Sequence, residues 1–267
     1  MSTRHVSVKL RDGVLVIRFT NDKARNAMTA EMRSQLSAAV EKARDDVSVR
    51  AIYITGTGSA FCAGGDLQML KNACEPWQVH RRFRQLGAWL LPLVQIEKPV
   101  IVGVNGVTVG GGIGIAMTGD IVIAAESASF VPGFFRLGVV PDVATMYTLP
   151  RVVGLAKAKR FLFGGEPLNA AQALDFGLVS RVVPDKDLDR ECLKIAQSLS
   201  DGPAEVIGLS KLLMSRTFET GMSEMFLLEG LGQALGMSSV EFREGLSAIL
   251  ERRPPKFRKN ARSSKRA

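Results

Sequence analysis

Histidine and cysteine are scarce in this chain of 267 residues, which holds two of the first and three of the second. The cysteines (Cys62, Cys74 and Cys192) are far apart and odd in number, which argues against a disulfide framework and favours reduced thiols. Cys62 has no histidine near it in the sequence, so we interpret it as a small buried side chain and not as a nucleophile. We expect no metal site. We also expect a cytoplasmic protein, because the first residues lack the apolar segment of a signal peptide.

Charge is missing from residues 100–119, a run of 20 residues that matches the length of a membrane-spanning helix. The run contains seven glycines and Asn105, and it divides into a strand, a turn and a short helix. A buried core explains this pattern better than a membrane span does, so we expect no membrane association.

Negative charge is absent from the last part of the chain, where residues 252–267 hold eight basic side chains. Removing these eight charges from the net charge of +9 leaves +1 for the other residues. We interpret the segment as a solvated basic tail; phosphate contact with a ligand and weak RNA binding are the alternatives. Phe257 is its single aromatic residue, so the segment lacks the stacking platform that specific nucleic-acid recognition needs.

Short β-branched runs alternate with amphipathic segments over residues 1–199, and this alternation favours an α/β fold with a layered core. Extended segments are expected over residues 6–10, 14–19, 49–55, 99–104, 120–124, 129–135 and 179–183. Helices are expected over residues 29–44, 77–95, 113–118, 142–152, 156–162, 169–176 and 188–199. We therefore predict a core domain over residues 1–199.

Residues 200–251 differ from this core because they are predicted to be helical, over residues 204–217 and 221–250. Apolar side chains such as Met222, Phe226 and Leu227 are more numerous there than a short appendage would expose. They are buried either in the core of the same chain or against another subunit. We predict an oligomerisation region at residues 200–251, followed by the basic tail at 252–267.

Two glycine-rich turns, at residues 60–67 (AFCAGGDL) and 105–114 (NGVTVGGGIG), each follow a short β-branched run. Glycine leaves the backbone N–H groups of such a turn open to a docking group. A strand, a tight turn and the start of a helix together aim these donors at one point, which suits negative charge. Two such turns could converge on one oxygen that becomes anionic during a reaction, so we expect chemistry here.

The turns belong to a longer pattern that resembles the crotonase superfamily, also called the enoyl-CoA hydratase/isomerase family. The pattern consists of DKARNAM at residues 22–28, FCAGGDL at 61–67, NG at 105–106, GGG at 110–112, LDFGLVSRVV at 174–183 and PKF at 255–257. It covers nearly the whole chain. The resemblance implies a crotonase-like spiral of ββα units with a helical C-terminal trimerisation region, assembled as a homotrimer or a dimer of trimers.

The resemblance also implies the ligand, an acyl group joined to coenzyme A as a thioester, with no permanently bound cofactor. The backbone N–H groups of Gly65 and Gly111 would form the oxyanion hole around the thioester carbonyl. The other residues expected at the substrate or coenzyme A are Ala24, Arg25, Ala63, Gly64, Asp66, Leu67, Gly110 and Phe134. For Asp66 we prefer a structural role, as the N-cap of the helix after the turn.

The sequence departs from the family's hydratases at both positions of their paired glutamates. These positions match Gly114 and Phe134, and neither residue can transfer a proton. Because the addition of water needs a positioned acid and base, a standard hydratase is disfavoured. The family's common isomerase base falls at the second of these positions and is also absent.

One acidic residue remains at a position that is catalytic elsewhere in the family. Asp142 matches the base of dienoyl-CoA isomerases and the nucleophile of 4-chlorobenzoyl-CoA dehalogenase. Phe134 matches an aromatic side chain of that dehalogenase, but its water-activating histidine falls near Gly87, seven residues from His80. We interpret both histidines of the chain as ordinary surface or satisfied residues. A structural alternative for Asp142 is the N-cap of the helix expected over residues 142–152.

The sequence thus predicts an acyl-CoA enzyme that stabilises an enolate or a tetrahedral intermediate through its oxyanion hole. Its reaction is predicted to be isomerase- or hydrolase-like and to depend on Asp142, the expected catalytic residue beside Gly65 and Gly111. The alternative is a member that binds acyl-CoA or a partner protein with little catalysis, which the missing glutamates also allow.

Overall fold

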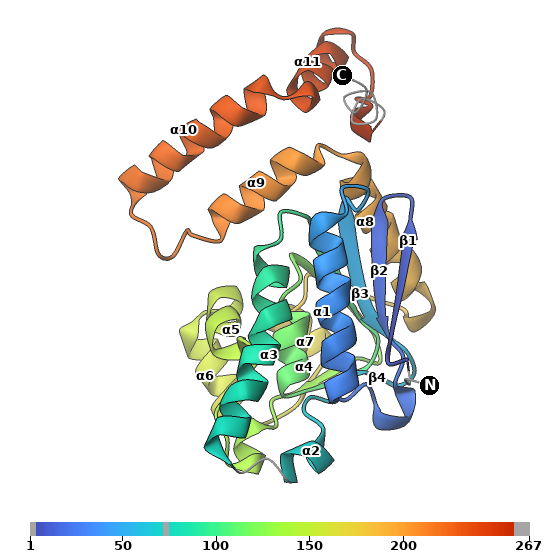
Figure 1. The fold of residues 1–267 in the computed structure, drawn as a ribbon, viewed down its shortest axis with the longest axis vertical. Helices are drawn as coiled ribbons and strands as arrows, with labels where there is room; N and C mark the ends of the chain where they lie inside the picture. Colours follow the sequence, from blue (N-terminus) through green and yellow to red (C-terminus); the bar gives the residue numbers. More distant parts are fainter. Residues whose placement is uncertain (1–3, 72–74, 259–267) are drawn as a thin grey trace.

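The computed structural model describes residues 4–71 and 75–258, and Figure 1 shows a body of strands and helices from which the last helices stand apart. The strands are β1 (Val6–Arg11), β2 (Val14–Phe19), β3 (Ala51–Gly56), β4 (Ala60–Cys62), β5 (Val100–Val104), β6 (Val107–Val109), β7 (Ile121–Ala125), β8 (Ser129–Val131), β9 (Leu168–Asn169) and β10 (Arg181–Val183). The helices of the body are α1 (Ala30–Asp45), α2 (Leu67–Lys71), α3 (Pro76–Gln95), α4 (Gly111–Ala116), α5 (Thr145–Val153), α6 (Leu155–Gly164), α7 (Ala170–Phe176) and α8 (Leu188–Asp201). The last helices are α9 (Ala204–Met214), α10 (Met222–Ser238) and α11 (Val240–Leu250), and short 3-10 helices are η1 (Asp22–Ala24), η2 (Phe134–Leu137) and η3 (Asp185–Asp187).

Within the described residues, the strands form a six-stranded sheet in the order β1-β2-β3-β5-β7-β10 and a four-stranded sheet in the order β4-β6-β8-β9. β1 and β2 make the expected antiparallel hairpin, whereas β2, β3, β5, β7 and β10 run parallel. The chain passes from β3 to β4, from β5 to β6 and from β7 to β8, each time crossing from the larger sheet to the smaller one. These repeated steps confirm the predicted α/β fold class.

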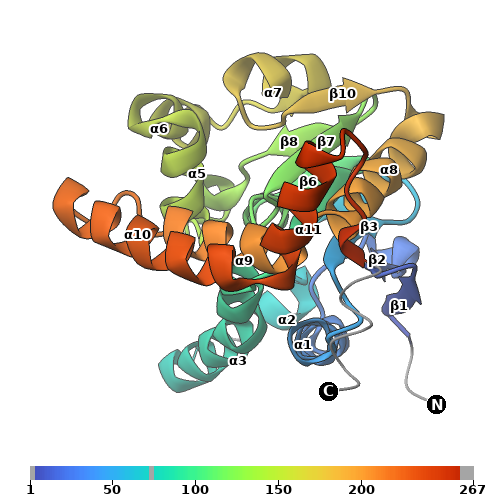
Figure 2. The same ribbon diagram turned by 90° about the horizontal axis from the view of Figure 1, so that it is seen from above.

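Helices α1 and α8 cover opposite sides of β2 and β3 (Figure 2). α1 starts as expected, because the Thr29 side chain accepts a hydrogen bond from the Met32 N–H at 3.2 Å. On the other side of the sheet, Cys192 and Ala196 of α8 pack in one apolar cluster with Tyr53. The apolar residues predicted for the inner face of α1 are all buried: Met32, Leu36, Ala39, Val40 and Ala43.

Helices α9, α10 and α11 stand away from the sheets, and α10 contacts α9 and α11 (Figure 1). None of the described residues of α10 is buried, although the helix carries Phe226 and Leu231. The helix predicted over residues 221–250 is broken at Ser239, whose hydroxyl accepts a hydrogen bond from the Phe242 N–H at 3.0 Å and so begins α11.

Ionic contacts attach these last helices to the larger sheet. Lys211 of α9 pairs with Asp120 at 2.9 Å. Arg50, next to β3, approaches Glu241 of α11 at 3.6 Å, and Glu241 is only 4% exposed. A buried carboxylate is tolerated when a cation and hydrogen-bond donors face it, so these contacts fix the position of the C-terminal helices.

The described part of the basic tail is tied to the body by further ion pairs. Arg253 pairs with Glu244 at 2.6 Å, and Arg258 lies 3.3 Å from Asp201. These pairs occupy charges that an RNA phosphate would otherwise neutralise. The remainder of the predicted tail, residues 259–267, lies outside the described residues.

Among the predicted elements whose bounds differ from the structure, two lie on either side of Gly138. The extended segment expected over residues 129–135 stops at Val131, because Gly133 adopts a φ of +63° and the chain turns into η2. The helix expected to begin at Asp142 begins at Thr145 instead. In the part of the chain that the structure describes, no helix combines the length and the apolar character needed to cross a membrane.

Candidate active site

The two glycine-rich turns pack backbone against backbone. Gly64 has a φ of +84°, and a Cβ added to it would lie 2.7 Å from the Val109 carbonyl oxygen and 3.6 Å from the Gly111 nitrogen. A Cβ on Gly112 would overlap the Cys62 carbonyl oxygen of the other turn. Glycine is therefore required here for close approach, and in Gly64 also for its left-handed backbone. The two turns thus lie against each other, as their predicted convergence on one oxygen requires.

The expected oxyanion donors lie at this junction. Gly111 is the first residue of α4, whose first N–H groups have no partner within the helix. Gly65 is exposed, and the neighbouring Gly64 carbonyl accepts a hydrogen bond from the Met28 N–H at 2.8 Å. Among the described residues, no backbone carbonyl accepts from the N–H of Gly65 or Gly111. Both N–H groups therefore remain available to a ligand oxygen.

Asp142 lies beside the second turn. Its Oδ1 atom is 3.2 Å from the position that a Cβ on Gly111 would occupy. The structural alternative, an N-cap role for Asp142, is not observed, because α5 starts at Thr145 after Val143 and Ala144, which have φ values of +53° and +57°. Non-glycine residues rarely adopt such values, and two in succession re-aim the chain before the helix begins. Asp142 is thus held against the glycine turn rather than along a helix axis.

Burial raises the pKa of Asp142 above its ordinary value, and the positive charge of Arg82 opposes part of this rise. A half-buried carboxyl group with a raised pKa next to a glycine turn is a candidate for a functional group. The geometry thus places Asp142 against Gly111, and Gly65 follows Gly64 in the turn that packs against Gly111.

Gly114, the position of the first missing glutamate, has no room for a side chain. A Cβ there would overlap the Val143 carbonyl oxygen and lie 2.8 Å from Thr145 Oγ1. The segment 142–145 fills the space that a glutamate would use. Phe134, at the position of the second glutamate, is buried, and its ring lies 3.7 Å from the Cβ position of Gly110. The site is therefore built around one carboxylate and an aromatic wall.

The residues expected to bind coenzyme A lie in the first glycine-rich turn and in the loop that packs against it. Ala24 ends η1, and Arg25 follows with a φ of +50° and accepts a hydrogen bond from the Ala63 N–H at 3.0 Å. Asp66 accepts from the Gln68 N–H at 3.0 Å, which confirms its role as the cap of α2. Leu67 is 62% exposed, as a residue on the rim of a binding site can be.

Two asparagines with no role predicted from the sequence stabilise this turn and its neighbouring strands by hydrogen bonds. Asn26 is fully buried, and its Nδ2 donates to the carbonyl oxygens of Thr57 and Ala60 at 3.0 and 2.8 Å. Asn105 accepts from the Gly56 N–H at 2.9 Å. These side chains satisfy backbone groups at the end of β3, in the turn that follows it and at the start of β4. The sequence indicated their importance only through their positions in the motifs at residues 22–28 and 105–106.

Arg82 on α3 was also missed. Its charge acts on Asp142, and its Nη1 atom is buried without a hydrogen-bond partner among the described residues. In the sequence it is one of several basic residues on an amphipathic helix, where a solvated position is the ordinary expectation. Only the fold brings it near the candidate site.

Other residues considered from the sequence are structural. His5 shares a hydrogen bond with Thr29 Oγ1 at 2.9 Å, and the exposed His80 ring packs edge-on against Trp77 at 5.7 Å. Cys62 is buried, which raises the pKa of its thiol to about 12 and confirms its interpretation as an inert side chain. Cys74 lies outside the described residues. In the described ranges, no group of three or more His, Cys, Asp or Glu side chains could hold a metal ion.

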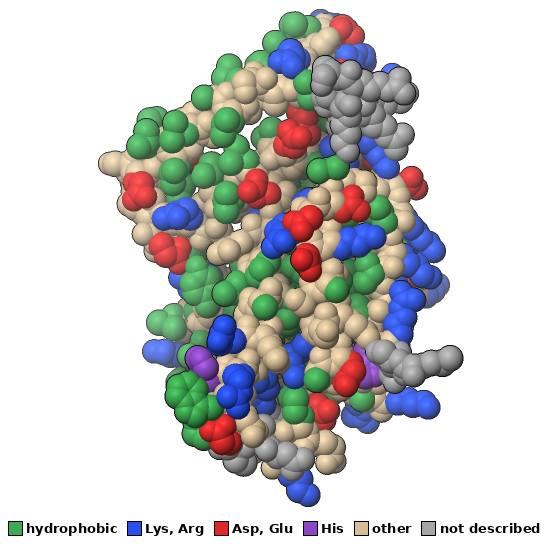
Figure 3. Space-filling model, viewed as in Figure 1, with side chains coloured by type: hydrophobic (Ala, Val, Ile, Leu, Met, Phe, Trp, Pro, Cys, Tyr) green, Lys and Arg blue, Asp and Glu red, His purple; other side chains and the backbone are tan. Residues whose placement is uncertain are grey.

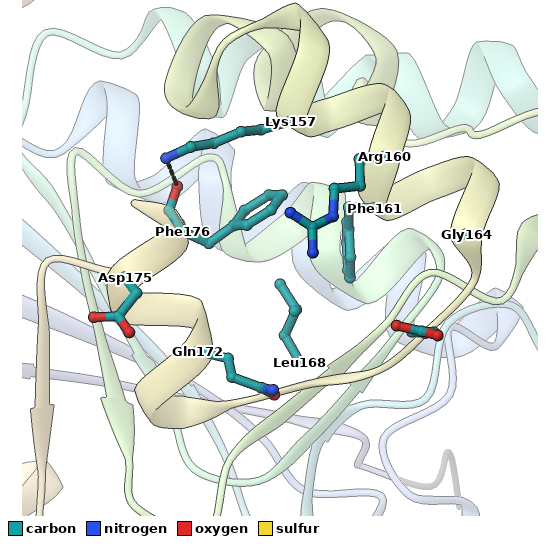
Figure 4. A pocket seen from close by; sticks show the side chains of 9 residues that line it. Lys157, Arg160, Phe161, Gly164, Leu168, Gln172, Asp175 and Phe176 are labelled. Atoms are coloured by element: carbon teal, nitrogen blue, oxygen red, sulfur yellow. Dashed lines mark hydrogen bonds between the residues drawn. The ribbon is translucent and has the colours of Figure 1, made fainter.

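A separate hollow of about 510 Å³ lies between α6, β9 and α7 (Figure 4). It is lined by Lys157, Arg160, Phe161, Gly164, Glu166, Leu168, Gln172, Asp175 and Phe176. None of the predicted site residues lines it. Lys157 donates to the Phe176 carbonyl oxygen at 3.2 Å across one end. The hollow is a feature of the surface apart from the glycine turns.

Comparison with known proteins gives concordant results. The family model described as enoyl-CoA hydratase/isomerase matches residues 9–260. A probable enoyl-CoA hydratase of Rhodobacter capsulatus is 34% identical over 96% of this chain and 99% of its own length. The 1,2-epoxyphenylacetyl-CoA isomerase of Escherichia coli is also 34% identical, over 92% of this chain and 95% of its own. A 4-chlorobenzoyl coenzyme A dehalogenase of Arthrobacter is 34% identical over 79% of this chain and 77% of its own length.

Solved structures agree with these relatives. A crystal structure of an enoyl-CoA hydratase/isomerase from Cupriavidus metallidurans superimposes with a TM-score of 0.90 at 31% identity, covering 97% of both chains. A second crystal structure, of an enoyl-CoA hydratase/isomerase from Mycobacterium abscessus, superimposes with a TM-score of 0.90 at 29% identity. It covers 94% of this chain and 98% of its own. The match extends through the spiral and the C-terminal helices.

Proposed function

Because the chain belongs to the enoyl-CoA hydratase/isomerase family and is an acyl-CoA enzyme, we propose that it grips the thioester carbonyl with the N–H groups of Gly65 and Gly111 and acts on the acyl group through Asp142. The observation that carries this proposal is the position of the Asp142 carboxylate, 3.2 Å from the Cβ position of Gly111. Isomerisation or substitution follows from this arrangement, rather than the addition of water by two glutamates.

The two turns supply the electrostatic part of the mechanism. Two preorganised N–H donors stabilise the negative charge that develops on the thioester oxygen when an enolate or a tetrahedral intermediate forms. Loss of one such donor typically costs about 3 kcal/mol of barrier. The donors act equally in every reaction that passes through such an oxyanion, so they do not select among the reactions of the family.

Asp142 supplies the selective part. As a base it removes a proton from one carbon of the acyl group and returns it to another, so that a double bond moves and no atom is gained or lost. As a nucleophile it attacks a carbon of the acyl group other than the thioester carbonyl and expels the leaving group of that carbon as an anion. Water then hydrolyses the resulting ester, which releases the hydroxylated acyl group and restores the carboxylate. The relatives named as an isomerase and as a dehalogenase support both forms of this proposal.

The alternative, an acyl-CoA-binding protein with little catalysis, is favoured by Gly114 and Phe134, which replace both family glutamates. A panel of enoyl-, cyclic and aromatic acyl-CoA thioesters, analysed by mass spectrometry after incubation, distinguishes the two. We expect conversion of at least one thioester. Tight binding without any product would support the alternative.

The pH dependence of catalysis provides a prediction. As base or nucleophile, Asp142 works only when ionised, so kcat/KM rises as pH rises through its pKa. Because burial raises this pKa, the midpoint of the acidic limb is expected above the ordinary 3.8. The substitution Arg82→Met removes a charge that favours the ionised form, so it moves the midpoint further up. Rates measured from about pH 4 to about pH 8 test this, and a limb that is unaltered by Arg82→Met would contradict it.

We further propose that α10 and its neighbours are covered by other copies of the chain in a homotrimer or a dimer of trimers. Figure 3 shows hydrophobic side chains gathered along α10. Met222 is 88% exposed, Phe226 is 75% exposed and Ile249 is 76% exposed. A continuous apolar surface of this kind marks an interface in soluble proteins.

This assembly is tested by light scattering of the purified protein. The wild type is expected to have the mass of a trimer or a hexamer. The double substitution of Phe226→Glu and Leu231→Glu places two charges in the apolar surface and is expected to yield monomers. Val47→Glu, at a residue that is 67% exposed near the start of β3, is the control and leaves the mass unchanged. A monomeric wild type would contradict the proposal.

A further inference from the structure

Arg82 has an unusual environment for a charged side chain, because part of its guanidinium is buried without an acceptor. Its Nη1 atom makes no hydrogen bond with any of the residues that the structure describes. The Phe83 ring, 5.7 Å from Cζ, offers only a weak cation–π contact. A buried N–H without an acceptor is costly and uncommon, so an acceptor from outside the chain is indicated.

A second guanidinium beside it is in a similar condition. Arg33 of α1 donates through Nη1 to the Met28 carbonyl oxygen at 3.0 Å, but its Nε is buried and unpaired among the described residues. Burial and repulsion by Arg82 lower the pKa of Arg33. The negative charges of Glu31 and Asp66 offset part of this effect, but among the described residues no carboxylate forms an ion pair with Arg33 or Arg82. A guanidinium binds an anionic oxygen more strongly than a neutral one, so an anion is the acceptor that suits this region.

Asp142 does not provide this anion. It interacts with Arg82 electrostatically, yet no nitrogen–oxygen distance within 4.0 Å joins the two side chains in the described structure. Its carboxylate lies instead against Gly111. Because the charge of Arg82 acts on Asp142, and Asp142 lies against Gly111, the guanidinium belongs to the surroundings of the candidate site.

We propose that Arg82 binds a carboxylate at the end of the acyl group remote from the thioester, so that the preferred substrates are CoA thioesters of dicarboxylic acids. This inference rests on the proposed function, because it places the thioester carbonyl at Gly65 and Gly111. The planar guanidinium matches both oxygens of a carboxylate, and Arg33 adds positive charge behind it. The negative charge of Asp142 disfavours binding of this carboxylate next to Gly111.

Calorimetric titration of the intact oligomer with saturated thioesters of matched length tests the proposal. The probes are adipoyl-CoA, hexanoyl-CoA and coenzyme A alone. Adipoyl-CoA is expected to bind roughly 10- to 100-fold more tightly than hexanoyl-CoA, the gain of a charge-assisted hydrogen bond. Arg82→Met removes this preference and leaves the affinity for hexanoyl-CoA unchanged, which also shows that the variant folds. Arg82→Lys, which keeps the charge but loses the planar fork, retains part of the preference.

Arg84→Met is the matched control, because Arg84 lies exposed on the same helix. It is expected to keep the full preference for adipoyl-CoA. Equal binding of adipoyl- and hexanoyl-CoA by the wild type would overturn the inference while the proposed function stood. An equal loss of affinity for all three probes in Arg82→Met would also overturn it and would assign Arg82 to a phosphate of coenzyme A. Failure of the wild type to bind any thioester would refute the proposed function itself.

Discussion

Replacing Asp142 by asparagine is expected to lower kcat by about 10²- to 10⁴-fold and to leave the Kd of a saturated acyl-CoA within about threefold of the wild-type value. Asparagine has nearly the same shape as aspartate, so the packing against Gly111 is kept. It can neither accept the substrate proton nor attack as a carboxylate. The loss should therefore fall on the chemical step and not on binding.

The measurement is steady-state turnover of a thioester that the wild type converts, together with calorimetric binding of hexanoyl-CoA. Asp175→Asn is the matched control, since Asp175 is an exposed aspartate in the separate hollow of Figure 4. It should retain wild-type turnover. Full activity of Asp142→Asn would remove this residue from the mechanism, and a collapse of Asp175→Asn would move the active site to that hollow.

Introducing the missing glutamate by Gly114→Glu is expected to destabilise the fold and to give no hydratase. A Cβ at this position overlaps the Val143 carbonyl oxygen, which belongs to the backbone and cannot rotate away. Overpacking of this kind costs about 3 kcal/mol in the free energy of unfolding. The segment 142–145 would have to move, and it carries Asp142.

Chemical unfolding of the wild type and of Gly114→Glu measures this loss of stability, and an enoyl-CoA hydration assay measures any hydratase activity of the variant. Gly164→Ala is the control, because Gly164 is helical and nothing lies within 4 Å of an added Cβ. Alanine should stabilise that helix slightly, by up to about 1 kcal/mol. If Gly114→Glu were as stable as the wild type and hydrated enoyl-CoA, the prediction would be wrong, and the segment 142–145 could move to accommodate the side chain.

Much of the fold could be predicted from local signals. The hairpin around Gly13, the N-cap at Thr29 and the strand–turn–helix units at both glycine turns follow from periodicity and turn chemistry. The glycine turns also pointed to the candidate site, because their sequences and spacing resemble those of a known family. Gly64 and Gly112 prove to be required by close backbone approach, which is the physical reason for that pattern.

The parts that sequence did not predict depend on tertiary contacts. Asp142 after Pro141 has the composition of a helix start, but Val143 and Ala144 adopt left-handed backbone angles that only the surrounding structure can impose. Arg82 is indistinguishable in the sequence from the solvated Arg84 two residues later. Its significance arises because α1 and α3 pack together and bring Arg33 next to it.

The central claim is that both glycine turns hold one thioester oxygen while Asp142 faces the acyl group. The most direct test is a crystal structure of the Asp142→Asn variant bound to a CoA thioester that the wild type converts. The thioester oxygen is predicted to lie within about 3.2 Å of the backbone nitrogens of both Gly65 and Gly111, with the side chain at position 142 against the acyl carbons. A thioester oxygen that contacts neither nitrogen, or a ligand seated between α6 and α7, would contradict the account.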